Sequence, residues 1–121
     1  MNQAALPHDH GTFWEKHMDS IPKTDEFQTP SDIFRLLGDS SRLRIFWILC
    51  HCEECVINIS AMMDMSSPAV SHHLKVLKAG RLIVSRRDGK EVYYRAADTK
   101  EAALLHHMSE ELLKITCPGT C

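Results

Sequence analysis

The chain has 121 residues, of which 44% are hydrophobic and 25% charged, and this composition predicts one globular domain with a modest core. Its apolar runs are far shorter than the roughly 18 residues that span a bilayer. Its first residues also lack a basic stretch followed by an apolar one. We therefore expect no membrane span and no secretion signal, and the predicted location is the cytoplasm.

Helices are predicted through the first half of the chain, after a loosely ordered start over residues 1–11. Thr12 is placed to cap a short helix to about Ser20, and the polar stretch 21–30, bounded by two prolines, predicts a connector. A helix is then predicted from a cap at Ser31, followed by a second, almost entirely apolar helix over residues 42–51. A helix that is this apolar is expected to lie in a core.

The second half predicts a short helix over residues 58–65, then a longer one that starts at a serine pair. Ser67 is predicted to be the N-cap of the longer helix, with Pro68 at its first position and its end near Ala79. Three apolar residues recur on this helix at i, i+4 and i+7, which predicts that they are buried: Val70, Leu74 and Leu77.

A hairpin and a last helix complete the predicted elements. Two β-rich runs, 82–84 and 92–94, flank Asp88-Gly89, which is a strong signal for a tight hairpin turn. The last helix is predicted from a cap at Asp98 to about Thr116. Its apolar stripe consists of Leu105, Met108, Leu112 and Ile115.

Two helices joined by a tight turn and followed by a hairpin are typical of a winged helix-turn-helix. The predicted fold class is therefore mainly α with a small β-hairpin. We divide the chain into an N-terminal arm with the first helix, residues 1–30, and a winged helix-turn-helix domain with a last helix and a cysteine tail, residues 31–121.

The charge distribution predicts double-stranded DNA as a partner. The formal net charge is −2, but the segment from Ser66 to Arg95 carries seven basic and two acidic residues. A basic segment on an acidic body is typical of a compact DNA reader, although a solvated charged face would show the same charge distribution. The first residues of a helix in the major groove meet base edges, while a hairpin reaches phosphates or the minor groove. The predicted contacts are Ser66, Ser67, Val70, Ser71, His72, His73, Lys75, Arg86, Arg87 and Lys90.

Five cysteines, an odd number without a secretion signal, favour reduced thiols over a disulfide framework. Cys52 and Cys55 form a C-x-x-C pair, and Cys117 and Cys121 a C-x-x-x-C pair. Two such pairs supply four sulfur ligands, with Cys50 as a fifth candidate that a place in the core would also explain. Thiolates favour soft or borderline ions, here Zn(II), Cd(II), Pb(II), Cu(I) or As(III).

Four segments of the chain carry a resemblance to a known family: 36–45 (LLGDSSRLRI), 55–59 (CVINI), 67–77 (SPAVSHHLKVL) and 86–94 (RRDGKEVYY). In these segments the sequence resembles the ArsR/SmtB family of bacterial metal-responsive repressors. The resemblance implies a homodimer joined mainly through its first and last helices, which binds an imperfect inverted repeat in operator DNA and releases it when an inducer binds.

The resemblance also implies a thiolate site at the start of the short helix, in a C-V-C-D-L pattern. Cys55 matches the first cysteine of that pattern, but Ile57 and Asn58 stand where the family has its second cysteine and its aspartate. Cys52 compensates in our interpretation, although the family pattern does not include it. The predicted function is thus a repressor that senses a metal ion through cysteine thiolates.

Three alternatives stay open. The segment around Cys50 resembles the first cysteine region of the persulfide-responsive branch of the family, so a thiol switch between Cys50 and Cys117 is the main alternative. The tail cysteines would also suit a permanent zinc clasp that senses nothing. A small thiol enzyme is more distant, because no catalytic motif frames any of the cysteines and the basic hairpin would have no role. We therefore predict no enzymatic activity.

Overall fold

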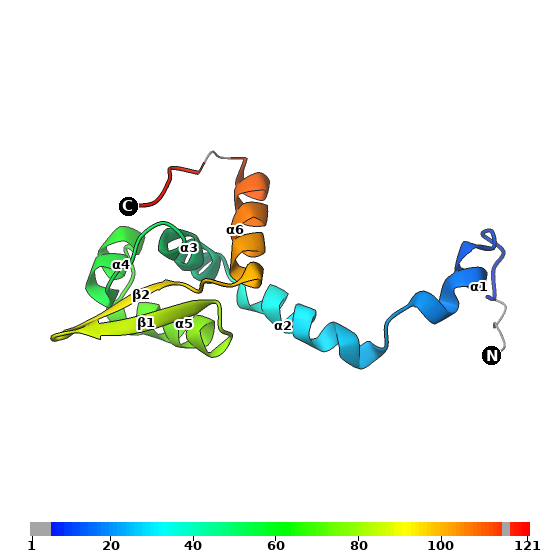
Figure 1. Cartoon of the computed structure of the whole chain (residues 1–121), viewed down its shortest axis with the longest axis horizontal. Helices are drawn as coiled ribbons and strands as arrows, with labels where there is room; N and C mark the ends of the chain where they lie inside the picture. Colours follow the sequence, from blue (N-terminus) through cyan, green and yellow to red (C-terminus); the bar gives the residue numbers. More distant parts are fainter. Residues whose placement is uncertain (1–5, 115–116) are drawn as a thin grey trace. The chain divides into compact units, whose positions relative to one another are not determined.

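The computed structural model describes residues 6–114 and 117–121 (Figure 1). The backbone divides into two compact units, Met1–Ser31 and Asp32–Cys121. The first unit contains helix α1 (Phe13–His17), which continues as a 3-10 turn over Met18–Ser20, and a second 3-10 turn over Thr24–Phe27. Among the described residues, no helix combines the length and the apolar character that a membrane crossing requires.

The predicted connector over residues 21–30 is wrong in its last three residues, because helix α2 runs over Gln28–Leu36. Pro30 lies in the first turn of this helix. A proline is tolerated there because the first four N–H groups of a helix have no acceptor within the helix. Ser31 is consequently inside α2 rather than its N-cap.

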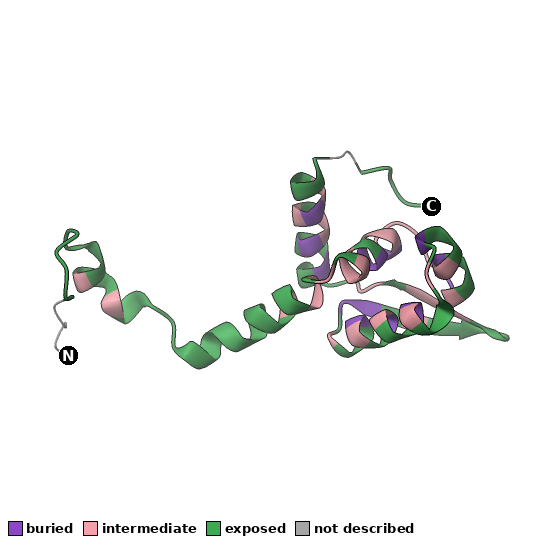
Figure 2. Ribbon diagram, turned by 180° about the vertical axis from the view of Figure 1, so that it is seen from behind, coloured by how far each residue is buried: buried purple, intermediate pink, exposed green. Residues whose placement is uncertain are grey.

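The second unit packs helices α3 (Ser40–Leu49), α4 (Val56–Met63), α5 (Ser67–Ala79) and α6 (Lys100–Leu113) around one core. The buried residues lie on the inward faces of these helices (Figure 2). Phe46 and Ile59 are fully buried, and the N-cap Asp39 of α3 accepts a hydrogen bond from the Arg42 amide at 3.0 Å. The apolar periodicity of α3 therefore places it in the core, as predicted.

Helices α4 and α5 form the helix-turn-helix. Asp64 ends α4 in the left-handed conformation, with φ of 52°. The Oγ of Ser66 accepts from the Ala69 amide at 3.3 Å, so Ser66 is the N-cap of α5 and the prediction of Ser67 is wrong by one residue. Burial of the three apolar residues at i, i+4 and i+7 is confirmed: Val70, Leu74 and Leu77.

The wing consists of two antiparallel strands, β1 (Ile83–Asp88) and β2 (Glu91–Ala96). The predicted Asp88-Gly89 hairpin is confirmed: Asp88 pairs with Glu91, and Gly89 has a φ of 64°, which a glycine adopts without steric cost. Both strands are longer than predicted, so Arg86 pairs with Tyr93 inside the ladder rather than lying in the turn.

Helix α6 departs from its prediction at both ends. Thr99, and not Asp98, is the N-cap, since its hydroxyl accepts from the Ala102 amide at 3.1 Å. The helix ends at Leu113, and the predicted stripe residue Ile115 lies outside the described residues. Leu105 is buried as predicted, but Leu112 is 76% exposed, so that part of the stripe is not in the core of this chain.

Candidate functional site

The exposed face of α5 carries most of the residues predicted to contact DNA. Those that are exposed are Ser66, Ser67, Ser71, His72 and Lys75. Val70 is the exception, and its prediction as a base contact is wrong: it is fully buried, because its place on the helix directs it into the core.

His73 is turned towards the start of α3 rather than towards solvent. Its side chain is 13% exposed, and its Nε2 lies 4.0 Å from Oδ1 of Asp39. The Arg42 amide, followed by the His73 and Arg42 charges, holds the pKa of Asp39 below its usual value against the opposing effect of burial. His72 therefore remains accessible on α5, whereas His73 lies against the α3 cap.

The wing presents Arg87 and Lys90 to solvent, but Arg86 is engaged within the chain. Its guanidinium makes a two-pronged contact with the Glu53 carboxylate, with both N···O distances at 2.8 Å. It also lies over the Tyr93 ring, 4.8 Å from the centroid. The Arg86 hydrogen bonds lower the pKa of Glu53 and raise that of Arg86. Arg86 thus joins the wing to the loop between α3 and α4.

This loop, residues 50–55, is hydrogen-bonded to the wing on one side and to the C-terminal tail on the other. The Glu54 amide donates to the Tyr94 carbonyl at 3.0 Å, and the Tyr94 amide donates back at 2.9 Å. On the other side the Cys121 amide donates to the His51 carbonyl at 3.2 Å. We call this segment the connecting loop.

The five cysteines predicted as metal ligands do not form a single cluster. Cys52 and Cys121 are joined in a disulfide, whereas the sequence predicted reduced thiols, so this pair can bind a metal only after reduction. Cys55 is buried as the N-cap residue of α4. Cys50 is partly buried, and burial followed by the nearby Glu110 and Cys117 raises its pKa to about 12. Cys117 is exposed.

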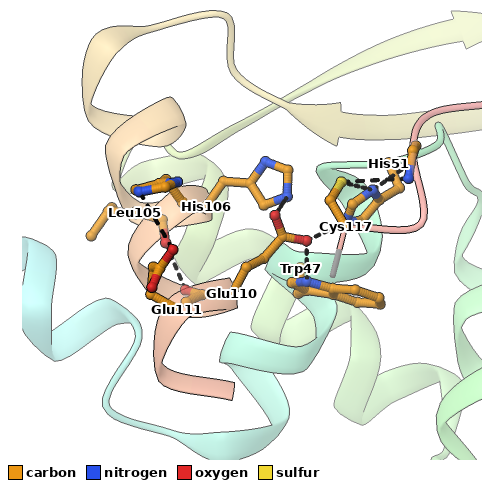
Figure 3. A network of polar contacts seen from close by, with 10 residues as sticks. Trp47, His51, Leu105, His106, Glu110, Glu111 and Cys117 are labelled. Carbon is orange, nitrogen blue, oxygen red and sulfur yellow. Dashed lines mark hydrogen bonds and ion pairs between the residues drawn. The ribbon is translucent and has the colours of Figure 1, made fainter. Parts of the chain in front are cut away.

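Cys117 lies in a group of four side chains that we call the Glu110 cluster: His51, His106, Glu110 and Cys117. One N, O or S atom from each lies within 4.8 Å of the others, and Figure 3 shows the Glu110 carboxylate between the two histidines. These side chains come from the end of α3, from α6 and from the tail. Among the residues that the structure describes, this is the one group of three or more such side chains that could surround an ion.

The surroundings of Glu110 are polar although its side chain is only 13% exposed. The Trp47 Nε1–H donates to its Oε2 at 3.2 Å. Burial raises the pKa of Glu110. The His106 charge and the hydrogen bonds from Cys117 and Trp47 together lower it by a larger amount, so the pKa lies below its usual value. The group is thus an ionised carboxylate with little access to water.

The sequence pointed to parts of this cluster but not to the whole of it. Cys117 is one of the predicted ligands, whereas His51, which follows Cys50 directly, was not weighed as a ligand. His106 and Glu110 stand one helical turn apart, which is a signal for a shared site, but such pairs are common on exposed helices. Only the fold of the tail, which returns Cys117 to the end of α3, brings the members together.

A model of the arsR family of bacterial regulatory proteins matches residues 39–85. The chain is 39% identical over 92 residues to a transcriptional repressor SmtB homolog of Synechocystis, covering 76% of this chain and 70% of that one. It is 38% identical over 97 residues to the cadmium resistance transcriptional regulatory protein CadC of Listeria innocua, covering 75% and 82%.

A solved structure is also similar. The solution structure of a homodimeric winged helix-turn-helix DNA-binding domain from Mycobacterium bovis is 26% identical, with a TM-score of 0.65, and the match covers 78% of this chain and 90% of that one. The order of α4, α5 and the β1–β2 wing agrees with that description. By sequence and by fold, the chain belongs to the arsR family of bacterial regulatory proteins and is a winged helix-turn-helix regulator rather than an enzyme.

Proposed function

We propose that this regulator is a repressor that binds operator DNA through α5 and the wing, and that a soft or borderline metal ion bound near its tail cysteines releases the DNA. The observation that carries the proposal is the connecting loop. It is bonded to the tail through His51 and Cys121 and to the wing through Glu54 and Tyr94. A change at the cysteines therefore has a short covalent and hydrogen-bonded route to a DNA-reading element.

The regulator acts as a homodimer in this proposal. The Mycobacterium bovis domain is described as homodimeric. In the second unit of this chain, large apolar side chains remain exposed on α2 and α6: Phe34 at 60%, Leu104 at 61% and Leu112 at 76%. A protein of this size buries a modest core on its own, and a second copy offers a cover for such side chains. Two α5 helices would then meet half-sites about one helical turn apart.

Metal binding would act by fixing the tail against the end of α3. A bound ion cross-links ligands from segments that are far apart in the sequence. The Glu53–Arg86 contact transmits a shift of the connecting loop directly to the half of β1 next to the hairpin turn. Because a dimeric DNA-binding protein must match two half-sites at once, a small change in the position of the wing opposes DNA binding. Coupling free energies of about 1–3 kcal/mol, or about 5–150-fold in affinity, are typical of such linkage.

The test is DNA affinity, measured by fluorescence anisotropy with the promoter region upstream of the coding sequence and the fully reduced protein at fixed salt. Zn(II), Cd(II), Pb(II), Cu(I) and As(III) are titrated in turn. Release of DNA by one ion, abolished by Cys117→Ser, supports the proposal. Equal affinity of metal-free and metal-loaded protein for every ion contradicts it.

A thiol switch is the second candidate, and the Cys52–Cys121 disulfide favours it. An organic persulfide accepts the two electrons: its sulfur–sulfur bond breaks, the two cysteine sulfurs join, and a thiol and hydrogen sulfide leave with the two cysteine protons. The predicted partners Cys50 and Cys117 are less suited, because the raised pKa of Cys50 keeps it a thiol rather than a nucleophilic thiolate. DNA release by a persulfide donor alone, lost in Cys121→Ser, would support this candidate over the metal sensor.

A further inference from the structure

We infer that the Glu110 cluster is a binding site for a borderline divalent cation such as Zn(II), held by one thiolate, two imidazoles and one carboxylate. The inference deepens the proposed function, on which its regulatory consequence rests, by naming the ligands and the class of ion. It differs from the predicted four-cysteine site in using Cys117 as its single thiolate.

The donor set and its spacing fit such an ion. The four ligand atoms lie within 4.8 Å of one another, so small movements of side chains bring them to a common centre. Zn(II) in proteins takes four ligands in tetrahedral geometry from cysteine, histidine and carboxylate side chains. The members come from three segments, which lets one ion join the end of α3, the helix α6 and the tail.

His51 is oriented as a ligand. Its Nδ1 lies 2.5 Å from the Gly119 carbonyl oxygen, which can only accept a hydrogen bond, so Nδ1 carries a ring proton; the Cys117 sulfur lies 3.6 Å from the same nitrogen. The other nitrogen, Nε2, faces the Glu110 carboxylate. A histidine ligand typically donates its second ring N–H to a carbonyl or carboxylate in this way, which fixes its tautomer and its orientation.

Each of the two histidines turns one buried nitrogen towards the Glu110 carboxylate, where it forms an ion pair only when it is protonated. The His51 side chain is 7% exposed, and its Nε2 is buried with no hydrogen-bond partner among the described residues, 3.5 Å from Oε2 of Glu110. The His106 Nε2 is likewise buried without a hydrogen bond, 3.2 Å from Oε1 of the same carboxylate. A buried polar atom without a partner is costly. A cation between these atoms satisfies both nitrogens and the carboxylate together.

Outer contacts hold two of the ligands in place. The Trp47 Nε1–H donates to the Glu110 carboxylate at 3.2 Å (Figure 3). The Gly119 amide lies 3.4 Å from the Cys117 sulfur and donates to it, which helps to hold the sulfur in position. A cavity of about 670 Å³ beside the cluster, bordered by Cys50, His51 and His106, gives an ion a route to it.

The ligand types set the expected selectivity. Imidazole and carboxylate ligands suit Zn(II) and similar divalent ions, whereas Cu(I) and other soft ions favour sites made of thiolates. With one sulfur among four donors, the cluster should bind Zn(II) and Co(II) more tightly than Cu(I) or As(III). The connecting loop begins at the cluster, so the site lies at one end of the proposed route to the wing.

Binding is tested with Co(II), which reports both geometry and ligand type in its absorption spectrum. The full-length protein is reduced, freed of reductant under anaerobic conditions and titrated, then challenged with Zn(II). We expect intense visible bands of tetrahedral Co(II), a near-ultraviolet thiolate-to-cobalt charge-transfer band, and displacement by Zn(II). Cys117 is exposed, so Cys117→Ser should fold and should lose the charge-transfer band.

The helix α6 offers a matched control for the histidine. His107 is adjacent to His106, but its side chain is 75% exposed and pairs with Glu111 outside the cluster. His106→Gln should weaken Co(II) binding by about 100-fold or more, since even outer-shell partners typically cost about 10–100-fold, whereas His107→Gln should match the parent. Trp47→Phe should weaken Co(II) binding by about 10–100-fold, as is typical of an outer-shell partner. Far-ultraviolet circular dichroism checks that each variant is folded.

The outcomes separate this inference from the proposed function. Weak octahedral bands alone, a charge-transfer band that survives Cys117→Ser, or equal Co(II) affinity of His106→Gln and His107→Gln would overturn the site. If metal still released DNA in those cases, the proposed function would stand with other ligands. If the site were confirmed but DNA affinity did not respond to Zn(II), the metal site would stand and the proposed regulation would fail.

Discussion

The N-cap of the recognition helix offers a sharp test, because the sequence and the structure name different residues. The sequence favoured Ser67, but the Oγ of Ser66 accepts from the Ala69 amide at 3.3 Å. Ser66 is exposed, so replacing it by alanine opens no cavity and removes only the cap. Loss of a serine cap lowers the free energy of unfolding by about 0.5–2 kcal/mol. Because the hydrogen bond from the Ala69 amide to Ser66 is long, we expect Ser66→Ala to cost about 1 kcal/mol.

Ser67→Ala is the matched control. The Ser67 hydroxyl lies 3.2 Å from that of Ser60 at the surface, and surface substitutions of this kind stay within about 0.5 kcal/mol. In a domain of 60–100 residues, about 1 kcal/mol lowers the melting temperature by about 4–8 °C. Thermal unfolding is followed by circular dichroism at one protein concentration, since an oligomer's melting temperature depends on it. A larger loss in Ser67→Ala than in Ser66→Ala would refute the cap assignment.

Three further predictions follow from the same unit. Leu74→Ala should lower the free energy of unfolding by about 2–5 kcal/mol in denaturant titrations, because Leu74 is 1% exposed, and a smaller loss than for a surface substitution would contradict the described core. Arg87→Ala should reduce the slope of log affinity for operator DNA against log salt by about 1 if Arg87 meets one phosphate; an unchanged slope would place it away from the DNA. Glu53→Gln should destabilise the protein at neutral pH by breaking the Arg86 contact. Because the pKa of Glu53 is lowered in the folded state, this stabilisation is fully present above the usual pKa of 4.5 and is lost as the pH falls through the lowered pKa. The melting temperatures of the parent and the variant should therefore converge in acid, and a constant difference between them would argue against the ion pair.

Much of the fold follows from local patterns in the sequence. The burial of Leu74 and Leu77 is encoded by their spacing, since residues three and four apart share a helix face. The hairpin follows from Asp88-Gly89, because Gly89 supplies the positive φ that the turn needs. Caps were less predictable: several serine, threonine and aspartate residues stand near each helix start, and backbone geometry decides which of them reaches the amide.

The start of α2 and the candidate site depend on less local information. Pro30 indicated a break, yet the first turn of a helix accepts proline, so composition alone could not distinguish a connector from a helix start. For the site, the cysteine spacing predicted two ligand pairs, Cys52 with Cys55 and Cys117 with Cys121, whereas the structure joins one member of each pair, Cys52 and Cys121, in a disulfide. Nothing in the spacing could show that Cys117 meets His51, because that contact depends on the path of the tail.

The measurement that tests the account most directly is operator affinity of the reduced protein with and without Zn(II), for the parent, His106→Gln and His107→Gln. At fixed salt, Zn(II) should weaken DNA binding by the parent and by His107→Gln by about 5–150-fold, the usual range of such coupling, and should leave His106→Gln unchanged. Equal affinity with and without Zn(II) in the parent, or equal release in both variants, would contradict the claim that the cluster links a metal ion to DNA release.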